Sequence, residues 1–134
     1  MREARDSFLH FLADNLTGIE IHPRRFDPND PSLTFLKEDA INVEFLGLSL
    51  GDVASQQVVL DIIHTDELTA VDWMQTVWSL FKAAFYTPLL DYSSGSPVST
   101  GKLLYWGRSV SFRRVYEDNY CRYSCTMNLR FQAV

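Results

Sequence analysis

The chain has few of the residues and patterns that mark specialised protein classes. Its 134 residues include two cysteines, six glycines and five prolines, which argues against a disulfide-rich, collagenous or disordered chain. Apolar runs stay well short of the ~18 residues that a membrane-spanning helix requires. The first six residues are mostly charged, with both signs present, and contain no apolar leader. We therefore expect neither a signal peptide nor a membrane partner, and a cytosolic site of folding.

Apolar and aromatic residues, in contrast, are well represented. Hydrophobic residues make up 46% of the chain and aromatic residues 13%. A chain of this length can bury most of its apolar surface in a single core without disulfides or metal. We expect one domain that spans residues 1–134.

Charge is distributed unevenly along the chain. The net charge is −5, yet the first 92 residues contain 15 acidic and 6 basic side chains, and the remainder contains 2 and 6. The acidic part of one copy could thus face the basic part of another, although a solvated surface would show the same pattern. A sequence pI near 5.0 argues against a general nucleic-acid binder.

The first half of the chain alternates between periodic segments and turn residues. Residues Arg2–Thr17 show helical periodicity and are followed by Gly18, which is typical of a helix end. A short alternating segment follows over Gly18–His22. The segment His22–Ser32 holds three of the five prolines and predicts a loop. Residues Ala40–Ser49 alternate as a strand does.

A strand that leads into a helix occupies the middle of the chain. Residues Gln57–His64 are apolar on both faces, which indicates a central strand. Thr65 is the expected N-cap of a helix that ends near Phe85 or Tyr86. Trp73 and Leu80 widen the apolar side of this helix, so it should contact more than one layer or another chain. The central apolar stripe consists of Val71, Met74, Val77, Trp78, Phe81 and Phe85.

The last third of the chain predicts a long hairpin. Residues Thr87–Gly101 are rich in turn formers and predict a loop. Residues Leu103–Tyr116 and Tyr120–Phe131 form the two arms, and the second arm alternates strictly between apolar and polar positions. The expected fold is α+β, a mainly antiparallel mixed sheet packed by two helices in the order α-β-β-β-α-β-β.

Motifs that would indicate catalysis or cofactor binding fail on spacing. Residues Gly95–Lys102 resemble a phosphate-binding loop, but five residues separate the glycines and Leu103 follows the lysine. Cys121 and Cys125 would lie ~13.6 Å apart on a strand, too far for a disulfide, and share its apolar face. We interpret both as small core residues.

The histidines form no pattern of metal ligands. His10, His22 and His64 fall on different predicted elements. Asp61 and His64 could make an acid–base pair only if they shared a face, and the period of two places them on opposite faces. The sequence therefore predicts no catalytic residue, no metal, no cofactor and no enzymatic activity.

Arginines are the most suggestive polar residues. Guanidinium groups suit contacts with carboxylates or phosphates, so these side chains could bind a neighbouring acidic subunit or nucleic acid. They could equally keep an exposed sheet face soluble. They are Arg24 and Arg25 in the proline-rich segment, and Arg108, Arg113, Arg114, Arg122 and Arg130 on the hairpin.

The layout resembles that of the tail terminator (tail completion) proteins of long-tailed bacteriophages. The features shared are the N-terminal helix, the strand Ile41–Ser49, the strand-into-helix unit Gln57–Phe85 and the closing hairpin Leu103–Phe131. The resemblance covers nearly the whole chain and is one of layout and length. It implies a structural protein that forms a ring, about six subunits round, on the last ring of the tail tube.

The resemblance also implies partners and a location. Such a ring stops growth of the tail-tube protein, offers a surface to a neck or head-completion protein, and surrounds the channel through which DNA leaves. The protein would belong to the head-proximal end of the virion tail and be assembled in the host cytoplasm. The expected interface residues are Arg24, Arg25, Trp73, Arg108, Arg113 and Arg114, with Trp73 as a buried subunit anchor and the arginines as ion-pairing or DNA-facing groups.

Two other functions fit the same residues. One is a different neck or head-completion ring protein. The other, from a different class, is a small ligand-binding or enzymatic α+β domain with a pocket near Tyr86, Tyr105 and Trp106.

Overall fold

The computed structural model describes residues 2–25, 28–107, 110–116 and 120–132. It shows an α+β fold with two α-helices and a mixed, mostly antiparallel sheet, which confirms the expected class. Four strands rather than two follow the second helix. The elements are α1 (Arg2–Asn15), β1 (Ile21–Arg24), the short 3-10 helix η1 (Pro31–Thr34), β2 (Ala40–Ser49), β3 (Ala54–His64), α2 (Glu67–Ala83), β4 (Tyr86–Asp91), β5 (Val98–Trp106), β6 (Arg113–Val115) and β7 (Cys121–Phe131).

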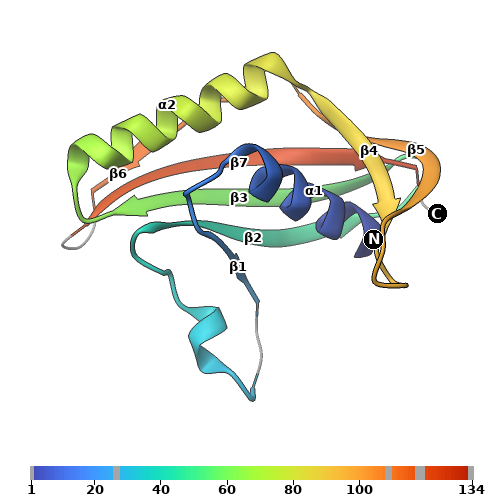
Figure 1. Cartoon of the computed structure of the whole chain (residues 1–134), viewed down its shortest axis with the longest axis horizontal. Helices are drawn as coiled ribbons and strands as arrows, with labels where there is room; N and C mark the ends of the chain where they lie inside the picture. The colour runs from blue at the N-terminus through green and yellow to red at the C-terminus, as the bar shows by residue number, and fades with distance from the viewer. Residues whose placement is uncertain (1, 26–27, 108–109, 117–119, 133–134) are drawn as a thin grey trace.

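The strands form one curled sheet around β3 and β7 (Figure 1). Their order is β1-β2-β3-β7-β5-β4, and β6 pairs with β7 beside this path. The pair β1 and β2 is parallel, and the other pairs are antiparallel. Strands β5 and β6 use the same edge of β7, at residues 129–131 and 122–124 respectively. The C-terminal strand thus joins all parts of the sheet.

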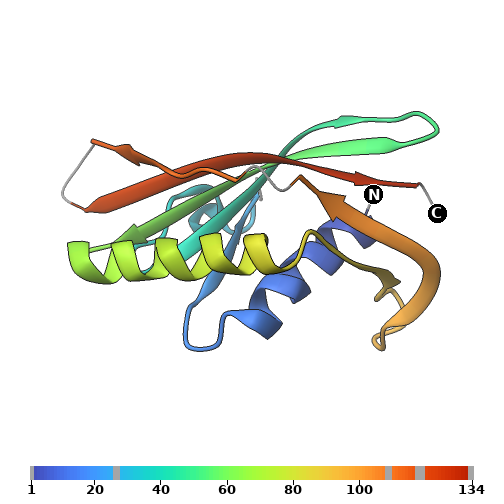
Figure 2. The ribbon, with the colours of Figure 1, turned by 90° about the horizontal axis from the view of Figure 1, so that it is seen from above.

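Both α-helices lie on one face of the sheet (Figure 2). Phe8 of α1 sits at the centre of the layer between them, fully buried, with its ring 6.2 Å from that of Phe81 on α2. It also meets Trp106 at 5.9 Å and Phe45 at 6.3 Å, both edge-on. This aromatic cluster links the two helices to strands from both halves of the chain.

Helix α1 forms where the periodicity predicts it. It buries Ala4, Phe8 and Leu12, which recur every four residues, and its last turn is followed by Gly18 at a φ of +81°. A left-handed φ is readily adopted by glycine, so this residue can reverse the chain towards β1.

Helix α2 begins one residue later than expected. Asp66, not Thr65, is the N-cap: its carboxylate accepts hydrogen bonds from the Thr69 backbone N–H at 3.0 Å and from the Thr69 hydroxyl. These bonds, the hydroxyl's first, lower the pKa of Asp66. Thr65 instead donates its N–H and hydroxyl to Asp39. Thr65 is thus engaged by a residue distant in sequence, and the next residue caps the helix.

The apolar stripe of α2 is rotated from the one expected. The fully buried positions are Ala70, Val77 and Phe81. Trp78 was expected in the stripe, but its side chain is 45% exposed. It follows Val77 and therefore lies about 100° further around the helix. Trp73 is half-buried and packs against the core.

The proline-rich segment contains more regular structure than expected. Strand β1 continues through Pro23 to Arg24, inside the segment predicted as a loop, and Pro23 pairs with Val43. Proline is tolerated there because β1 is the edge of the sheet and needs hydrogen bonds on one side only.

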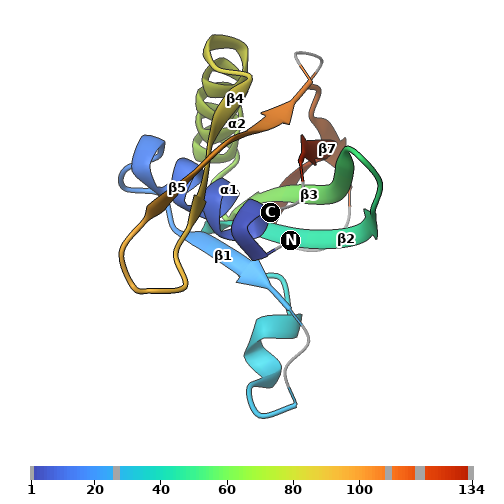
Figure 3. The same cartoon turned by 90° about the vertical axis from the view of Figure 1, so that its right-hand side faces the viewer.

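The predicted loop over Thr87–Gly101 is wrong. Strand β4 and the start of β5 occupy it, and only residues 92–97 form the turn. In Figure 3 this β4–β5 hairpin lies beside α1. The hydroxyl of Ser7 on α1 accepts the N–H of Leu90 at 2.9 Å and donates to its carbonyl at 3.3 Å, at the bulge where the β4 register shifts. Contacts with α1 therefore stabilise strands that local sequence does not predict.

The first arm of the predicted C-terminal hairpin is divided into β5 and β6. Strand β5 ends at Trp106, whose indole enters the aromatic cluster and donates Nε1–H to the carbonyl of Ala84 at 2.9 Å. Strand β6 then begins only at Arg113. The second arm is confirmed as β7, with Cys125, Met127, Leu129 and Phe131 buried on the helix-covered face.

Candidate interaction surfaces

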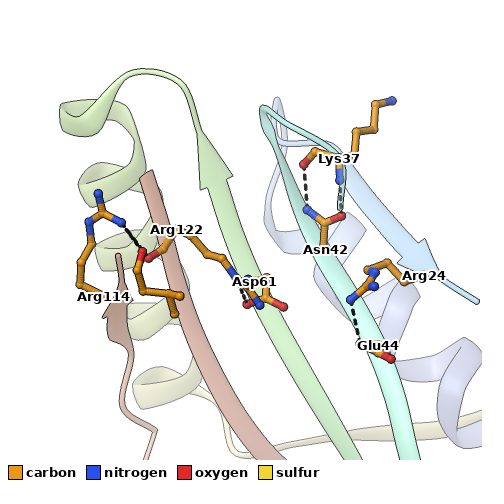
Figure 4. A network of polar contacts seen from close by, with 8 residues as sticks. Arg24, Lys37, Asn42, Glu44, Asp61, Arg114 and Arg122 are labelled. Carbon is orange, nitrogen blue, oxygen red and sulfur yellow. Dashed lines mark hydrogen bonds and ion pairs between the residues drawn. The ribbon is translucent and has the colours of Figure 1, made fainter. Parts of the chain in front are cut away.

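A band of polar contacts crosses the sheet (Figure 4). Arg122 on β7 donates its Nε–H to Asp61 on β3 at 2.9 Å, and Asp61 is only 2% exposed. Asn42, beside Asp61 on β2, accepts the N–H of Lys37 and donates to its carbonyl. These groups are buried because they are paired, so Arg122 serves the fold and is not available to a partner.

Two of the arginines expected at an interface are also engaged within the domain. Arg24 forms an ion pair with Glu44 at 2.8 Å and donates to the carbonyl of Thr34. Arg114 donates to the carbonyl of Val115 at 2.6 Å, and its guanidinium lies over the ring of Tyr123. Both side chains are half-buried, and these contacts account for their positions.

The other expected interface residues differ in accessibility. Arg25 and Arg113 are exposed, and neither has an ion-pair or hydrogen-bond partner among the residues that the structure describes. Trp73 packs edge-on against His64, with ring centroids 4.9 Å apart. Arg108 lies outside the described residues. Of the expected interface arginines that the structure describes, Arg25 and Arg113 are thus the two that offer a guanidinium to a partner.

An apolar groove lies between α2 and residues 110–112. Its volume is about 320 Å³, and Met74, Trp78, Val110 and Phe112 form its walls. The ammonium group of Lys82 lies 5.3 Å from the centre of the Trp78 ring. We call this feature the α2 groove. Its walls from α2 belong to the expected central stripe, whereas Trp73 and Leu80, which widen the apolar side of the helix, pack against the core.

A second apolar surface is the tip of the hairpin that joins β2 and β3. We call residues 46–53 the hairpin tip. Four large apolar side chains are exposed there, with Leu50 at 64% and Val53 at 59%. The others are Leu46 and Leu48. This patch was not among the expected interface residues, although the leucines at positions 46, 48 and 50 continue the side of the strand that Asn42 and Glu44 make polar.

The α2 groove and the hairpin tip are distinct surfaces (Figures 1 and 2). The turn between β2 and β3 lies at the end of the molecule near the C-terminus, whereas α2 begins at the opposite end. Exposed apolar patches are typical of surfaces that bind other molecules. Here one small domain carries two such patches, which differ from each other and lie on separate parts of the fold.

Among the residues that the structure describes, side chains capable of chemistry do not converge on a common site. Within the described residues no three of His, Cys, Asp and Glu cluster as metal ligands. His64 lies 3.5 Å from Asp39, whereas Asp61 pairs with Arg122. The acid–base pair of Asp61 and His64 is therefore not formed in the described structure. The two cysteines are free and buried, as expected, and burial raises the pKa of Cys125 to about 11. Such a thiol is a poor nucleophile.

The aromatic residues of the alternative ligand site are partly brought together. Tyr86 and Tyr105 face one another across β4 and β5 with ring centroids 6.1 Å apart, and both are about half exposed. Trp106 is buried in the core, at the edge of a hollow of about 360 Å³ that Tyr105 and Arg130 also line.

Comparisons with known proteins do not assign this chain to a family. Neither protein-family models nor curated proteins give a match to this chain. In the described residues, no helix is both long and apolar enough to cross a membrane.

Proposed function

We propose that this protein is a structural virion assembly protein, a tail terminator of a long-tailed bacteriophage. In this role it forms a ring of about six subunits at the head-proximal end of the tail. The ring caps the tail tube, stops polymerisation of the tube protein and provides the surface to which the neck or head attaches. Its DNA contacts are those of a channel wall, made transiently as DNA passes.

One observation carries this proposal: a single small domain exposes two unlike apolar surfaces, the α2 groove and the hairpin tip. A closed ring requires a heterologous contact, in which one patch of a subunit meets a different patch of its neighbour. Two unlike patches on separate parts of the fold meet that requirement. A monomeric binding domain requires only one.

Charge supports the same proposal. The last third of the chain is basic and the rest acidic, and the exposed side chains of Arg25 and Arg113 have no partner among the described residues. An ion pair with a neighbouring subunit would set the register of a ring without contributing much to its affinity.

The test is to measure self-association and tube capping in parallel. The native mass of the purified protein is followed over a concentration series, with negative-stain images of the largest species. The protein is then added to polymerising tail-tube protein of the same phage. We expect closed rings, tubes that stop growing and an extra ring at one tube end. A protein that neither self-associates nor binds tube ends would contradict the proposal, and thermal-shift screening of small ligands would then test the alternative.

A further inference from the structure

We propose that neighbouring subunits join by insertion of the hairpin tip of one copy into the α2 groove of the next. This inference rests on the proposed ring function and specifies its interface. The occupant of the groove is a second copy of this chain. Three features of the described residues lead to it: the shape of the hairpin, the apolar walls of the groove and the charges beside each.

The hairpin tip is held in a projecting position. The pairing of β2 with β3 shifts register between Phe45 and Leu48, which marks a bulge at the base of the tip. The buried side chain of Gln56 donates to the carbonyl of Leu46 at 2.7 Å and lies 3.3 Å from that of Gly47. Arg5 of α1 in turn donates to Gln56 Oε1 at 3.2 Å. A bulge bends a strand and increases its twist, and here its freed carbonyls are fixed by hydrogen bonds to a buried side chain.

This arrangement reduces the cost of docking. The base of the hairpin is ordered before any partner binds, so less conformational entropy is lost when the exposed leucines become buried. The apolar groups of Leu50 and Val53, at the turn itself, are the most exposed of the tip. Burial of these two side chains in an apolar site would therefore remove the most apolar surface from water and contribute most to the free energy of docking.

The α2 groove is suited to aliphatic side chains. Trp78 and Phe112 supply aromatic walls, and Met74 supplies a flexible one. Aromatic and methionine side chains are common at the centre of protein interfaces. Strand β6 follows the groove in sequence, and its partner in the described sheet is β7. The other edge of β6 can therefore pair with an incoming segment, as edge strands do.

Charges beside the two surfaces are complementary. Asp52 is exposed at the turn of the hairpin tip, and Arg113 is exposed next to Phe112 of the groove. Neither has a partner in the part of the chain that the structure describes. Lys82 also places a positive charge at the groove wall, over the Trp78 ring. Docking would pair Asp52 with Arg113.

The contact is heterologous, which makes a mixing experiment decisive. Leu50→Asp disables the tip and leaves the groove intact, whereas Trp78→Asp disables the groove and leaves the tip intact. Leu50 is 64% exposed and Trp78 45%, so each variant should keep a melting temperature and circular dichroism spectrum close to those of the wild type. Each variant alone should be a monomer, with association weakened roughly tenfold or more. An equimolar mixture should form one-to-one heterodimers through the single functional tip and groove, and no rings.

A matched control and a charge exchange complete the test. Val98→Asp changes an exposed apolar residue on the β4–β5 hairpin, 53% exposed, and should leave rings intact. Asp52→Arg and Arg113→Asp should each weaken association, and the double variant should restore it. Arg130→Asp, at an exposed arginine of β7 outside the tip and the groove, should have little effect.

The outcomes separate this inference from the proposed function. If Leu50→Asp and Trp78→Asp each form rings like those of the wild type, the inference is overturned while the ring function stands. Variants that are monomeric alone and remain so when mixed would also overturn it, since the contact would not join tip to groove. If the mixture forms heterodimers but the wild type does not bind tube ends, the result supports the interface and contradicts the tail-terminator function. A wild type that is monomeric with and without tubes would overturn both.

Discussion

The two faces of the sheet bury their residues by different means. The face under α1 and α2 is closed by a layer of apolar side chains, with Phe8, Phe81 and Trp106 in mutual contact (Figure 2). On the opposite face Asp61 and Asn42 are buried and paired, Asp61 with Arg122 of β7 and Asn42 with the backbone of Lys37 just before β2. Packed helices exclude water from the first face. On the second face, an ion pair and amide hydrogen bonds satisfy the polar groups that are buried.

This difference teaches which face tolerates change. Apolar burial contributes in proportion to area and depends on close packing. A buried ion pair contributes little overall, because desolvation offsets attraction, yet removal of one partner leaves a costly unpaired charge. We therefore expect the helix-covered face to determine stability, and the open face to respond to single changes more than to paired ones.

The largest effect is expected at the centre of the covered face. Phe8→Ala removes the ring that links both helices to the sheet and should lower the free energy of unfolding by about 3–5 kcal/mol. Urea denaturation followed by tryptophan fluorescence measures the change. Phe35→Ala, at an exposed ring, is the control and should shift stability by less than about 0.5 kcal/mol. Equal effects at the two positions would remove the distinction between core and surface.

The open face should show a smaller and reversible loss. Arg122→Leu leaves Asp61 buried without its guanidinium and should cost about 2–3 kcal/mol, below the range for fully enclosed pairs because the Arg122 side chain is 19% exposed. The double variant Asp61→Leu, Arg122→Leu should recover most of that loss, as measured by a double-mutant cycle in urea. Arg130→Leu, on the same strand but exposed, is the matched control. A double variant less stable than Arg122→Leu would contradict the expected dominance of desolvation.

A polar group on the covered face provides a sharper comparison. Gln56→Ala deprives the bulge carbonyls of Leu46 and Gly47 of their donor and should cost about 1–2 kcal/mol. Hydrogen exchange should also show faster opening of the hairpin tip than of β7. Gln57→Ala, one residue on and facing the other way, should leave the exchange of the tip unchanged. Slow exchange at the tip in Gln56→Ala would show that the turn alone holds the hairpin.

The smallest effect is on thiol chemistry. Burial raises the pKa of Cys125 to about 11, so at pH 8 roughly one of these thiols in a thousand is ionised. Iodoacetamide should therefore modify Cys125 more slowly than Cys121, which is slightly more exposed at the start of β7. Mass spectrometry of peptides over a time course distinguishes the two. Faster reaction at Cys125 would show that the covered face opens locally near that residue.

Local pattern predicted the elements that are amphipathic on their own. Helix α1, strand β2 and strand β7 lie where period and turn residues place them, because each presents an apolar face that any packed partner would bury. Strand β4 and the first part of β5 were not predicted, since their pairing is stabilised by Ser7 and by the entry of Trp106 into the core.

The candidate surfaces were harder to predict than the fold. The sequence identified the arginines and the excess apolar width of α2, but a single chain gives no sign of which guanidinium already has a partner. Arg24 pairs with Glu44, twenty positions away, whereas Arg25 faces solvent. The hairpin tip and the α2 groove emerged only when exposure could be assigned to each apolar residue.

The sequence by itself determined the fold class, the inward face of β7, and, to within a few residues, the ends of α1, α2, β2, β3 and β7. These depend on periods of two and 3.6 residues, which are local properties of the backbone. Tertiary structure alone decided which cap α2 uses, which arginines are engaged, and where Trp78 is left exposed. Those features depend on partners far apart in the chain, and the free energy of a contact exists only once both partners are in place.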